Sequence, residues 1–403
     1  MNGAHLRSVP LDDLGALRIA GTDAERFLQG QVSNDLGRVG AERSLLAGLH
    51  NPQGRTIALL RIVQLAPGDL LALLPRELAA GVAGRLSRYV LRAKVRVTDE
   101  SQSWRIVGLI ACGFDATTHD QAPETPPTLL ATFPAAAGEQ RRTGGRVVVC
   151  VGEQPARWLA IAPAAVAPAH GASTPNDRDD LPPSIAAPRE LWRQLDIIAG
   201  LPQVYGATSE EFVAQMLNLD VVGAIAFDKG CYTGQEVIAR AHYRGRVKRR
   251  LQRFRSRGPL ELAPGDGGEL PDGGPFKVVE AVRLEDGRCE FLAVAPMPAG
   301  EPALSATTQP DAMLERVSAP LAARPSQAGA AALTRANVGA PATGAALHAA
   351  VPAELTTTGA VWAPFATSPA GTPREGAPML PLGIAEELPQ DLERLDLPYA
   401  LPD

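Results

Sequence analysis

The chain has 403 residues and a formal net charge of -5, and 45% of its residues are hydrophobic. Because single hydrophobic cores rarely grow beyond about 250 residues, this length predicts more than one domain. The mild acidity argues against direct nucleic-acid binding. The sequence shows no signal peptide and no apolar run near the roughly 18 residues of a membrane span, which predicts a cytoplasmic protein without a membrane partner.

The first block, residues 1–100, alternates strand, turn and helix signals. A helix is predicted after Thr22-Asp23-Ala24-Glu25, which has the pattern of a capping box. A second helix is predicted between Arg76 and Leu91, because apolar residues there recur at helical spacing. Strands are predicted over Leu17–Gly21, Arg55–Val63, Asp69–Leu74 and Val95–Thr98, with a turn at Asn51–Gly54. This irregular alternation indicates an α+β domain.

The second block, residues 101–187, has strand patterns at Arg105–Ile110 and Arg146–Val151. Its end, 164–183, is rich in Pro, Asp, Ala and Ser and is predicted to be a linker. We interpret this block as a second α+β domain.

The third block, residues 188–250, opens with a helix, because Pro188 is favourable at a helix start. Thr208-Ser209-Glu210-Glu211 is a second possible capping box. From 251 the apolar period changes to two, and Asp286-Gly287 between two such runs indicates a hairpin. We therefore expect an antiparallel β-domain over 251–299 with 390–403. The low-complexity stretch 300–389 between its parts is expected to be largely disordered.

Four cysteines, Cys112, Cys150, Cys231 and Cys289, lie far apart. They form no Cys-x-x-Cys pair, so we expect reduced thiols, no disulfide framework and no metal site. Cys231 alone has a chemically suggestive setting, between Lys229-Gly230 and a helix expected to begin near Gly234. A helix N-terminus and nearby cations favour the thiolate, which acts as nucleophile, redox centre or metal ligand. The alternative is a small buried cysteine that only fills space.

The segment Lys229-Gly230-Cys231-Tyr232-Thr233-Gly234-Gln235-Glu236, hereafter the signature, resembles the K-G-C-Y-x-G-Q-E motif of YgfZ-type folate-binding proteins. That family belongs to the aminomethyltransferase, or GcvT-like, superfamily. The resemblance covers roughly residues 10–300 and the last ten. Further similar stretches are Gly21–Asp35, Ala199–Pro202, Gln215–Asp220, Arg240–Ala241, Tyr243–Gly245 and Leu397–Tyr399.

The resemblance implies a three-domain ring with tetrahydrofolate in a central hole and a small C-terminal antiparallel β-barrel. It implies a monomeric accessory protein for iron–sulfur cluster assembly or repair. Its partners would be iron–sulfur enzymes, including tRNA-modifying ones, or assembly proteins. By this likeness Cys231 is the functional thiol and Trp192 packs on the folate, whereas Leu14 replaces an aromatic contact of some members. The other expected folate contacts are Lys229, Gly230, Tyr232, Gly234, Gln235, Glu236 and Arg240.

Asn34 and Asp35 could hydrogen-bond the polar edge of a pterin, or could simply be cap and loop residues. Without the resemblance, a tryptophan on a helix such as Trp192 is more often a core residue than a ligand platform. The basic run from Arg240 to Arg250 is typical of a solvated face, but could steer the glutamate tail of folate or RNA. We expect Trp192 and the signature to line one cleft.

Two other functions remain open. A folate-dependent aminomethyltransferase of the glycine cleavage type shares the fold and the folate, but leaves the signature thiol unexplained. A non-catalytic interaction scaffold would have an inert Cys231.

Overall fold

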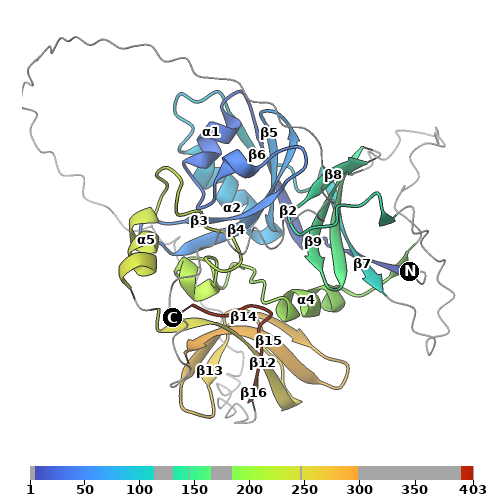
Figure 1. Ribbon diagram of the computed structural model, residues 1–403, viewed down its shortest axis with the longest axis vertical. Coiled ribbons are helices and arrows are strands. Elements are labelled where there is room, and N and C mark those ends of the chain that lie inside the picture. Colours follow the sequence, from blue (N-terminus) through green and yellow to red (C-terminus); the bar gives the residue numbers. More distant parts are fainter. Residues whose placement is uncertain are drawn as a thin grey trace, which may run out of the picture. The chain divides into compact units, whose positions relative to one another are not determined.

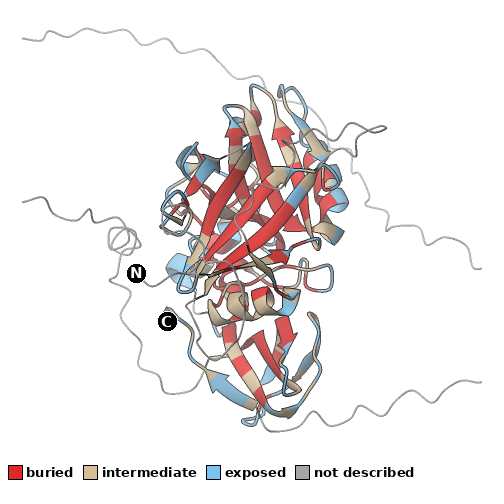
Figure 2. Ribbon diagram, turned by 90° about the vertical axis from the view of Figure 1, so that its right-hand side faces the viewer, coloured by how far each residue is buried: buried red, intermediate tan, exposed pale blue. Residues whose placement is uncertain are grey.

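The computed structural model describes residues 5–112, 130–143, 145–164, 184–245, 247–297 and 392–402. These residues all fall in one compact unit, and they form three separate β-sheets with short helices between them (Figure 1). Figure 2 shows that the buried residues are concentrated in the strands. The predicted linker at 164–183 and the low-complexity stretch 300–389 lie outside the described residues, apart from Ala164.

The first sheet is antiparallel and has the strand order β3-β4-β5-β2-β6. Its strands are β2 Leu14–Ala20, β3 Leu45–His50, β4 Thr56–Ala66, β5 Asp69–Pro75 and β6 Arg96–Asp99. Helices α1 (Ala24–Gln29) and α2 (Arg76–Ser87) pack against this sheet, and the 3-10 turn η1 (Leu36–Arg38) follows α1. The helical spacing of Ala79, Val82 and Leu86 explains the packing of α2, because it places all three in the core.

The second sheet has the order β11-β1-β7-β10-β9-β8. It brings together strands that are far apart in the sequence, because its edge strand β11 pairs with the N-terminal strand β1. Its strands are β1 His5–Pro10, β7 Trp104–Cys112, β8 Gln140–Thr143, β9 Arg146–Glu153, β10 Ala156–Pro163 and β11 Ile185–Ala186. The N-terminal strand β1 pairs with β7 over its whole length, so it belongs to this sheet and not to the first one. The domain boundaries that we draw from the sequence stay predictions.

The third sheet is antiparallel, has the order β13-β14-β15-β12-β16, and curls into a half-barrel (Figure 1). Its strands are β12 Arg249–Pro259, β13 Gly267–Glu269, β14 Pro275–Arg283, β15 Arg288–Pro296 and β16 Leu392–Leu395. The predicted hairpin at Asp286-Gly287 is confirmed, since β14 and β15 pair around it. Near the C-terminus, β16 pairs with β12 and forms one edge of this sheet.

Three helical elements connect these sheets. Helix α4 (Arg189–Ile198) follows Pro188 as predicted and contacts β14, β15 and β1. The 3-10 turn η2 (Ala214–Leu217) packs against β12. Helix α5 (Gln235–Arg244) begins directly after Gly234, as the signature predicts.

Both predicted capping boxes are wrong. At α1 the Glu25 carboxylate accepts a hydrogen bond from the Gly68 amide (2.8 Å) instead of turning back to its own helix. Asp23, the residue before α1, accepts one from the Lys94 amide (2.7 Å). The second candidate opens no helix, because the Thr208 hydroxyl closes a local turn by accepting from the Tyr205 amide (3.0 Å). In both places a tertiary or turn partner competes successfully for the side chain.

Candidate functional site

The signature begins with a lysine whose charge is fully engaged by the main chain. The Lys229 ammonium donates to the carbonyl oxygens of Gln29 (2.6 Å), Val32 (2.6 Å) and Asn34 (3.0 Å). An ammonium has three donors, so these bonds use all of them. Burial lowers the pKa of Lys229 to about 8, with Asp35 opposing the shift. The residue expected to favour a thiolate at Cys231 thus joins the signature to the segment after α1.

The next residues of the signature alternate between exposed and buried. Cys231 is exposed, as is Gly230, whereas the Tyr232 side chain is only 8% exposed. Burial raises the pKa of Tyr232 to about 12, and its ring lies 4.9 Å from the Lys229 ammonium. The buried His50 ring lies 6.4 Å from the Tyr232 ring. Tyr232 therefore anchors the segment in the core while the neighbouring thiol points to solvent.

Gly234 ends the loop in a conformation that requires glycine. Its φ of +84° is in the left-handed region, and a Cβ there would lie 2.5 Å from the Asn51 carbonyl oxygen. Gln235 donates weakly to the Lys229 carbonyl (3.5 Å). Glu236 and Arg240 lie on α5 and are exposed.

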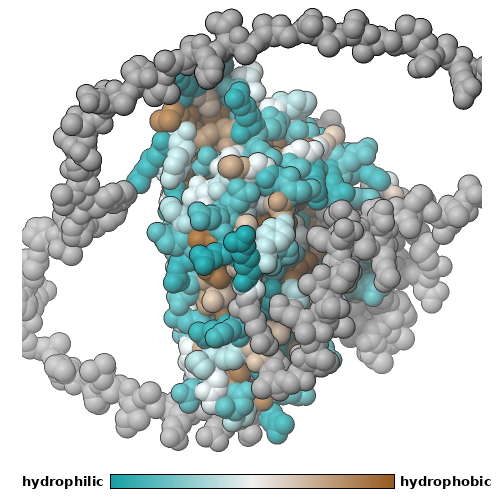
Figure 3. All heavy atoms as spheres, turned by 60° about the vertical axis from the view of Figure 1, so that its left-hand side comes forward, coloured by the Kyte–Doolittle hydropathy of each residue, from teal (hydrophilic) through white to brown (hydrophobic). Residues whose placement is uncertain are grey.

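Hydrophilic residues cover most of the face drawn in Figure 3, with hydrophobic residues between them.

Asn34 and Asp35 have structural partners for their polar atoms. The Asn34 amide donates to the carbonyls of Leu46 (2.7 Å) and Gly223 (2.8 Å), and its oxygen accepts from the Asp35 amide (2.8 Å). The Asp35 carboxylate caps η1 by accepting from the Gly37 amide (3.1 Å). The arrangement matches the cap-and-loop interpretation, and their role toward a pterin stays a prediction.

The basic run from Arg240 to Arg250 is not a uniformly solvated face. Arg250 is 2% exposed, and its guanidinium forms an ion pair with Asp220 (3.0 Å). Arg240 and Arg244 are exposed, and Arg246 lies outside the described residues. Part of this run thus stabilises the junction of η2 and β12.

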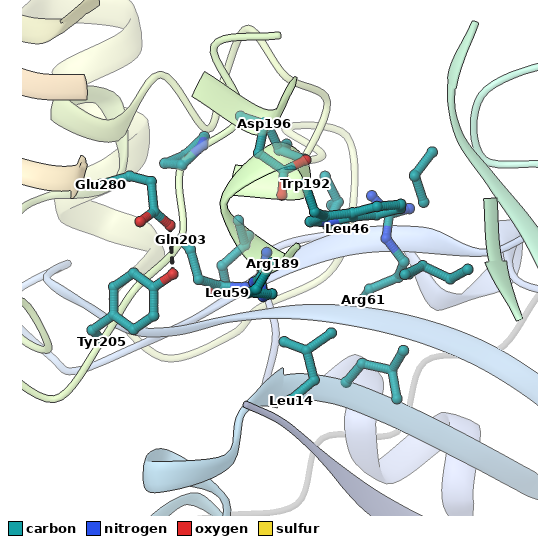
Figure 4. Close-up of a pocket in the computed structure, with 15 residues that line it drawn as sticks. Leu14, Leu46, Leu59, Arg61, Arg189, Trp192, Asp196, Gln203, Tyr205 and Glu280 are labelled. Atoms are coloured by element: carbon teal, nitrogen blue, oxygen red, sulfur yellow. Dashed lines mark hydrogen bonds between the residues drawn. The ribbon is translucent and has the colours of Figure 1, made fainter. Parts of the chain in front are cut away.

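A pocket of ≈ 620 Å³, open solvent at its mouth included, lies elsewhere in the same unit (Figure 4). Its apolar lining comes from both of the first two sheets and from the loop after α4. These residues are Leu14, Leu46, Leu59, Leu73, Val151, Leu159, Leu201 and Pro202. The polar and aromatic lining residues are Arg61, Arg189, Trp192, Asp196, Gln203, Tyr205 and Glu280.

Trp192 belongs both to the core and to this pocket. Its side chain is 4% exposed and packs closely on β7, because a Cβ at Gly108 would lie 2.4 Å from the indole. The Arg157 guanidinium lies 5.2 Å from the ring centroid. Only glycine at 108 leaves room for the ring, which fixes the indole in the pocket wall. Leu14, where some family members have an aromatic residue, lines the same pocket.

Tyr205 and Glu280 form a buried hydrogen bond at the other end of the pocket, in which the phenol donates to the carboxylate (Figure 4). Glu280 is 3% exposed, and burial raises its pKa to about 7. Burial also raises the pKa of Tyr205, and the Glu280 carboxylate adds to that shift. A carboxyl group with a near-neutral pKa beside an apolar cavity is a candidate for ligand binding.

Most charges around the pocket are paired with each other. The Arg157 guanidinium donates to Asp196 (2.7 Å), and the Arg189 guanidinium contacts both oxygens of Asp13 (2.9 and 3.0 Å). Buried charges are tolerated when they are paired in this way. The pairs hold α4 against the two first sheets, because Asp13 precedes β2 and Arg157 lies in β10.

The structure does not form the single cleft that the sequence predicts. No residue of Lys229–Glu236 lines the pocket, so Trp192 and Cys231 belong to different places in the described part of the chain. The sequence analysis also missed Arg61, Arg189, Asp196, Tyr205 and Glu280. Arg61 and Glu280 carried a usable signal, because each is a charged residue inside an apolar strand, where such residues are rare without a partner.

The described residues contain neither a candidate membrane span nor a candidate metal cluster. No helix among them is long and apolar enough to cross a membrane. No group of three or more His, Cys, Asp or Glu side chains there could hold a metal ion.

No family model matches this sequence. The tRNA-modifying protein YgfZ of Escherichia fergusonii is 30% identical over 293 residues, which span 70% of this chain and 83% of that protein. The solved structure of the glycine cleavage system aminomethyltransferase T from Bartonella henselae matches with a TM-score of 0.54 and 13% identity. That match covers 73% of this chain and 79% of the other, and it confirms the α+β, GcvT-like fold. A heterotetrameric sarcosine oxidase from Corynebacterium sp. U-96 matches 39% of this chain and 75% of its own, with a TM-score of 0.25 and 12% identity.

Proposed function

Because this chain belongs to the YgfZ family of GcvT-like proteins, we propose that it binds tetrahydrofolate in the Trp192 pocket and takes part in tRNA modification. We further propose that it acts as an accessory protein for iron–sulfur enzymes, with Cys231 as the functional thiol. The observation that carries the folate proposal is the pocket itself, which combines an indole, an apolar wall and groups of both charges.

The residues around the pocket fit the chemistry of a folate. A pterin presents N–H donors and carbonyl and ring-nitrogen acceptors on a flat ring, and a carboxyl such as Glu280 accepts from such donors. One buried nitrogen of Arg189, Nη1, has no hydrogen-bond partner within the described part of the chain, so a donor is available for a ligand acceptor. When bound, tetrahydrofolate supplies a carrier for one-carbon groups. The protein's own residues hold and orient it and exclude water from its ring.

Isothermal titration calorimetry tests the folate proposal directly. We expect wild type to bind tetrahydrofolate and Trp192→Leu to bind it at least tenfold more weakly. Trp104→Phe is the matched control, since Trp104 lies outside the pocket lining and hydrogen-bonds to Glu100. Wild type that does not bind tetrahydrofolate at millimolar concentration would contradict the proposal.

The thiol is proposed to act on a macromolecular partner and not on the pocket ligand. Cys231 is exposed, and its segment does not contribute to the pocket lining. The thiol is therefore accessible to another protein while the pocket is filled.

Complementation of a deletion strain tests the role of the thiol. Cys231→Ser should reduce the tRNA modifications made by iron–sulfur enzymes, whereas the control Cys112→Ser should not. Full modification with Cys231→Ser would favour the scaffold alternative. Release of ammonia from an aminomethyl donor by the wild-type protein with tetrahydrofolate would favour the aminomethyltransferase alternative.

A further inference from the structure

Arg61 places a positive charge in the wall of the pocket. It lies in the middle of β4, between its neighbours Leu46 on β3 and Leu73 on β5. All three line the pocket, as does Leu59, two residues before Arg61 on the same face of the strand. In Figure 4, Arg61 and Trp192 lie toward one end of the pocket, and Tyr205 and Glu280 toward the other. The guanidinium is thus carried by a strand position flanked by leucines and lies toward the same end of the pocket as the indole.

Arg61 differs from the other arginines of this region in having no partner. Arg157 is paired with Asp196 and Arg189 with Asp13, whereas no hydrogen bond or ion pair joins Arg61 to any described residue. Asp196 stabilises its charge only at longer range, and Arg157 opposes that effect. Burial lowers the pKa of Arg61 to about 10, so the guanidinium remains charged at neutral pH.

The carboxylate that acts on Arg61 is already engaged, because Asp196 accepts a hydrogen bond from Arg157 (2.7 Å). A guanidinium in an apolar wall is costly unless an anion pairs with it, and its planar fork matches a carboxylate with two parallel hydrogen bonds. The pocket therefore lacks one anion of this geometry, which a ligand can supply.

We propose that Arg61 binds a carboxylate of the ligand, and that on the proposed folate function this is a carboxylate of the glutamate tail. Arg61 then determines specificity for folates that carry the tail over pterins that lack it. The inference rests on the proposed function for the name of the ligand, and on the unpaired guanidinium for the subsite.

The test compares two ligands on matched variants by calorimetry. Wild type should bind tetrahydrofolate at least tenfold more tightly than tetrahydropteroate, which lacks the glutamate. Arg61→Met should weaken the binding of tetrahydrofolate by ~10- to 100-fold, which is the range expected for hydrogen bonds to charged groups. The Kd of tetrahydropteroate should change by less than about twofold. Arg61→Lys keeps the charge without the fork and should lie between them. Arg288→Met, which removes an exposed arginine of the β14–β15 hairpin, should change neither ligand.

The outcomes separate the two proposals. Equal weakening of both ligands by Arg61→Met overturns the carboxylate subsite while folate binding stands. Wild type that binds neither ligand overturns both proposals. Thermal unfolding checks the variant itself, because replacing an unpaired, half-buried charge with an apolar side chain should not lower Tm. If Arg61→Met does lower Tm, the two ligands are compared on Arg61→Lys instead. Weaker binding of tetrahydrofolate with unchanged binding of tetrahydropteroate then supports the carboxylate subsite, and equal weakening of both overturns it.

Discussion

The Trp192 pocket and the signature use their charged groups in different ways. Around the pocket, charged side chains from separate elements pair with one another, as Arg157 does with Asp196. In the signature, the Lys229 ammonium donates all its hydrogen bonds to main-chain carbonyls, and the thiol of the nearby Cys231 is exposed. Because the pocket charges are paired through side chains, their protonation and pairing can change with pH or with a bound ligand. Because Lys229 is bonded to the main chain, it fixes the signature loop, and the exposed thiol of Cys231 remains accessible to another protein.

The largest expected effect concerns the titration of the pocket. Glu280 has an unfolded pKa near 4.5 and a folded pKa of about 7, so the native state holds its proton more tightly. Its contribution to stability is fully present below pH 4.5 and is lost as pH rises through 7. The shift corresponds to about 3 kcal/mol of unfolding free energy. The charged and titratable groups that act on Glu280 are Tyr205, Arg189, Arg193 and Asp196.

Urea unfolding of wild type and Glu280→Gln at pH 5 and pH 8 measures this effect. The wild type should lose stability between the two values, and the glutamine variant should lose clearly less. Asp286→Asn is a matched control, because Asp286 is exposed on the β14–β15 hairpin. An equal pH dependence of wild type and Glu280→Gln would show that this carboxyl does not titrate as we expect.

Ligand binding should distinguish the two regions. Tetrahydrofolate at a hundredfold excess over its Kd should stabilise the wild type by about 2.7 kcal/mol through linkage. At the same ligand concentration we expect Trp192→Leu to lose at least about half of this ligand-induced shift and Cys231→Ala to retain all of it, because only Trp192 lines the pocket. Differential scanning calorimetry with and without ligand measures the shift. A loss of the shift in Cys231→Ala would connect the two regions that the structure separates.

Removing the lysine of the signature should destabilise the fold. Lys229→Met leaves the carbonyls of Gln29, Val32 and Asn34 without their donor, at a cost of about 2 kcal/mol of unfolding free energy. Lys277→Met removes only a partly exposed pair with Glu211 (3.5 Å) and should cost less than about 1 kcal/mol. Urea unfolding measures both variants. An equal loss of unfolding free energy in Lys229→Met and Lys277→Met would contradict the structural role that we assign to Lys229.

The smallest expected effect is that of folate on the thiol. Iodoacetamide should label Cys231 before the buried Cys150 and Cys289, and saturating tetrahydrofolate should change its rate by less than about twofold. Burial raises the pKa of Cys289 to about 11 and also raises that of Cys150, which slows both thiols further. Mass spectrometry assigns each label. Strong protection of Cys231 by folate would place the thiol at the ligand.

Local patterns in the sequence were enough to predict most of the elements. The apolar spacing in α2, the glycine before α5 and the Asp286-Gly287 hairpin act through neighbouring residues, so each could be read from a short stretch. Both capping boxes failed for the opposite reason. Glu25 found the distant Gly68 amide, and a short motif carries no information about such a partner.

The candidate site also has a part that local sequence predicts and a part that it does not. The signature identified Cys231 and the start of α5, because those features lie within a few residues of one another. The pocket joins residues from β2 to β14, and its charge pairs link positions such as Arg189 and Asp13 that are 176 residues apart. Which charges are paired therefore depends on packing, and so does the isolation of Arg61.

The sequence by itself determined the family, the positions of most strands and helices, and the thiol of the signature. The tertiary structure decided that Lys229 contacts main-chain carbonyls, that Cys231 is outside the Trp192 pocket, and that Glu280 and Arg61 are inside it. The physical reason is range. Helix, turn and strand preferences act between near neighbours in the chain, whereas burial and charge pairing depend on which distant segments the fold brings into contact.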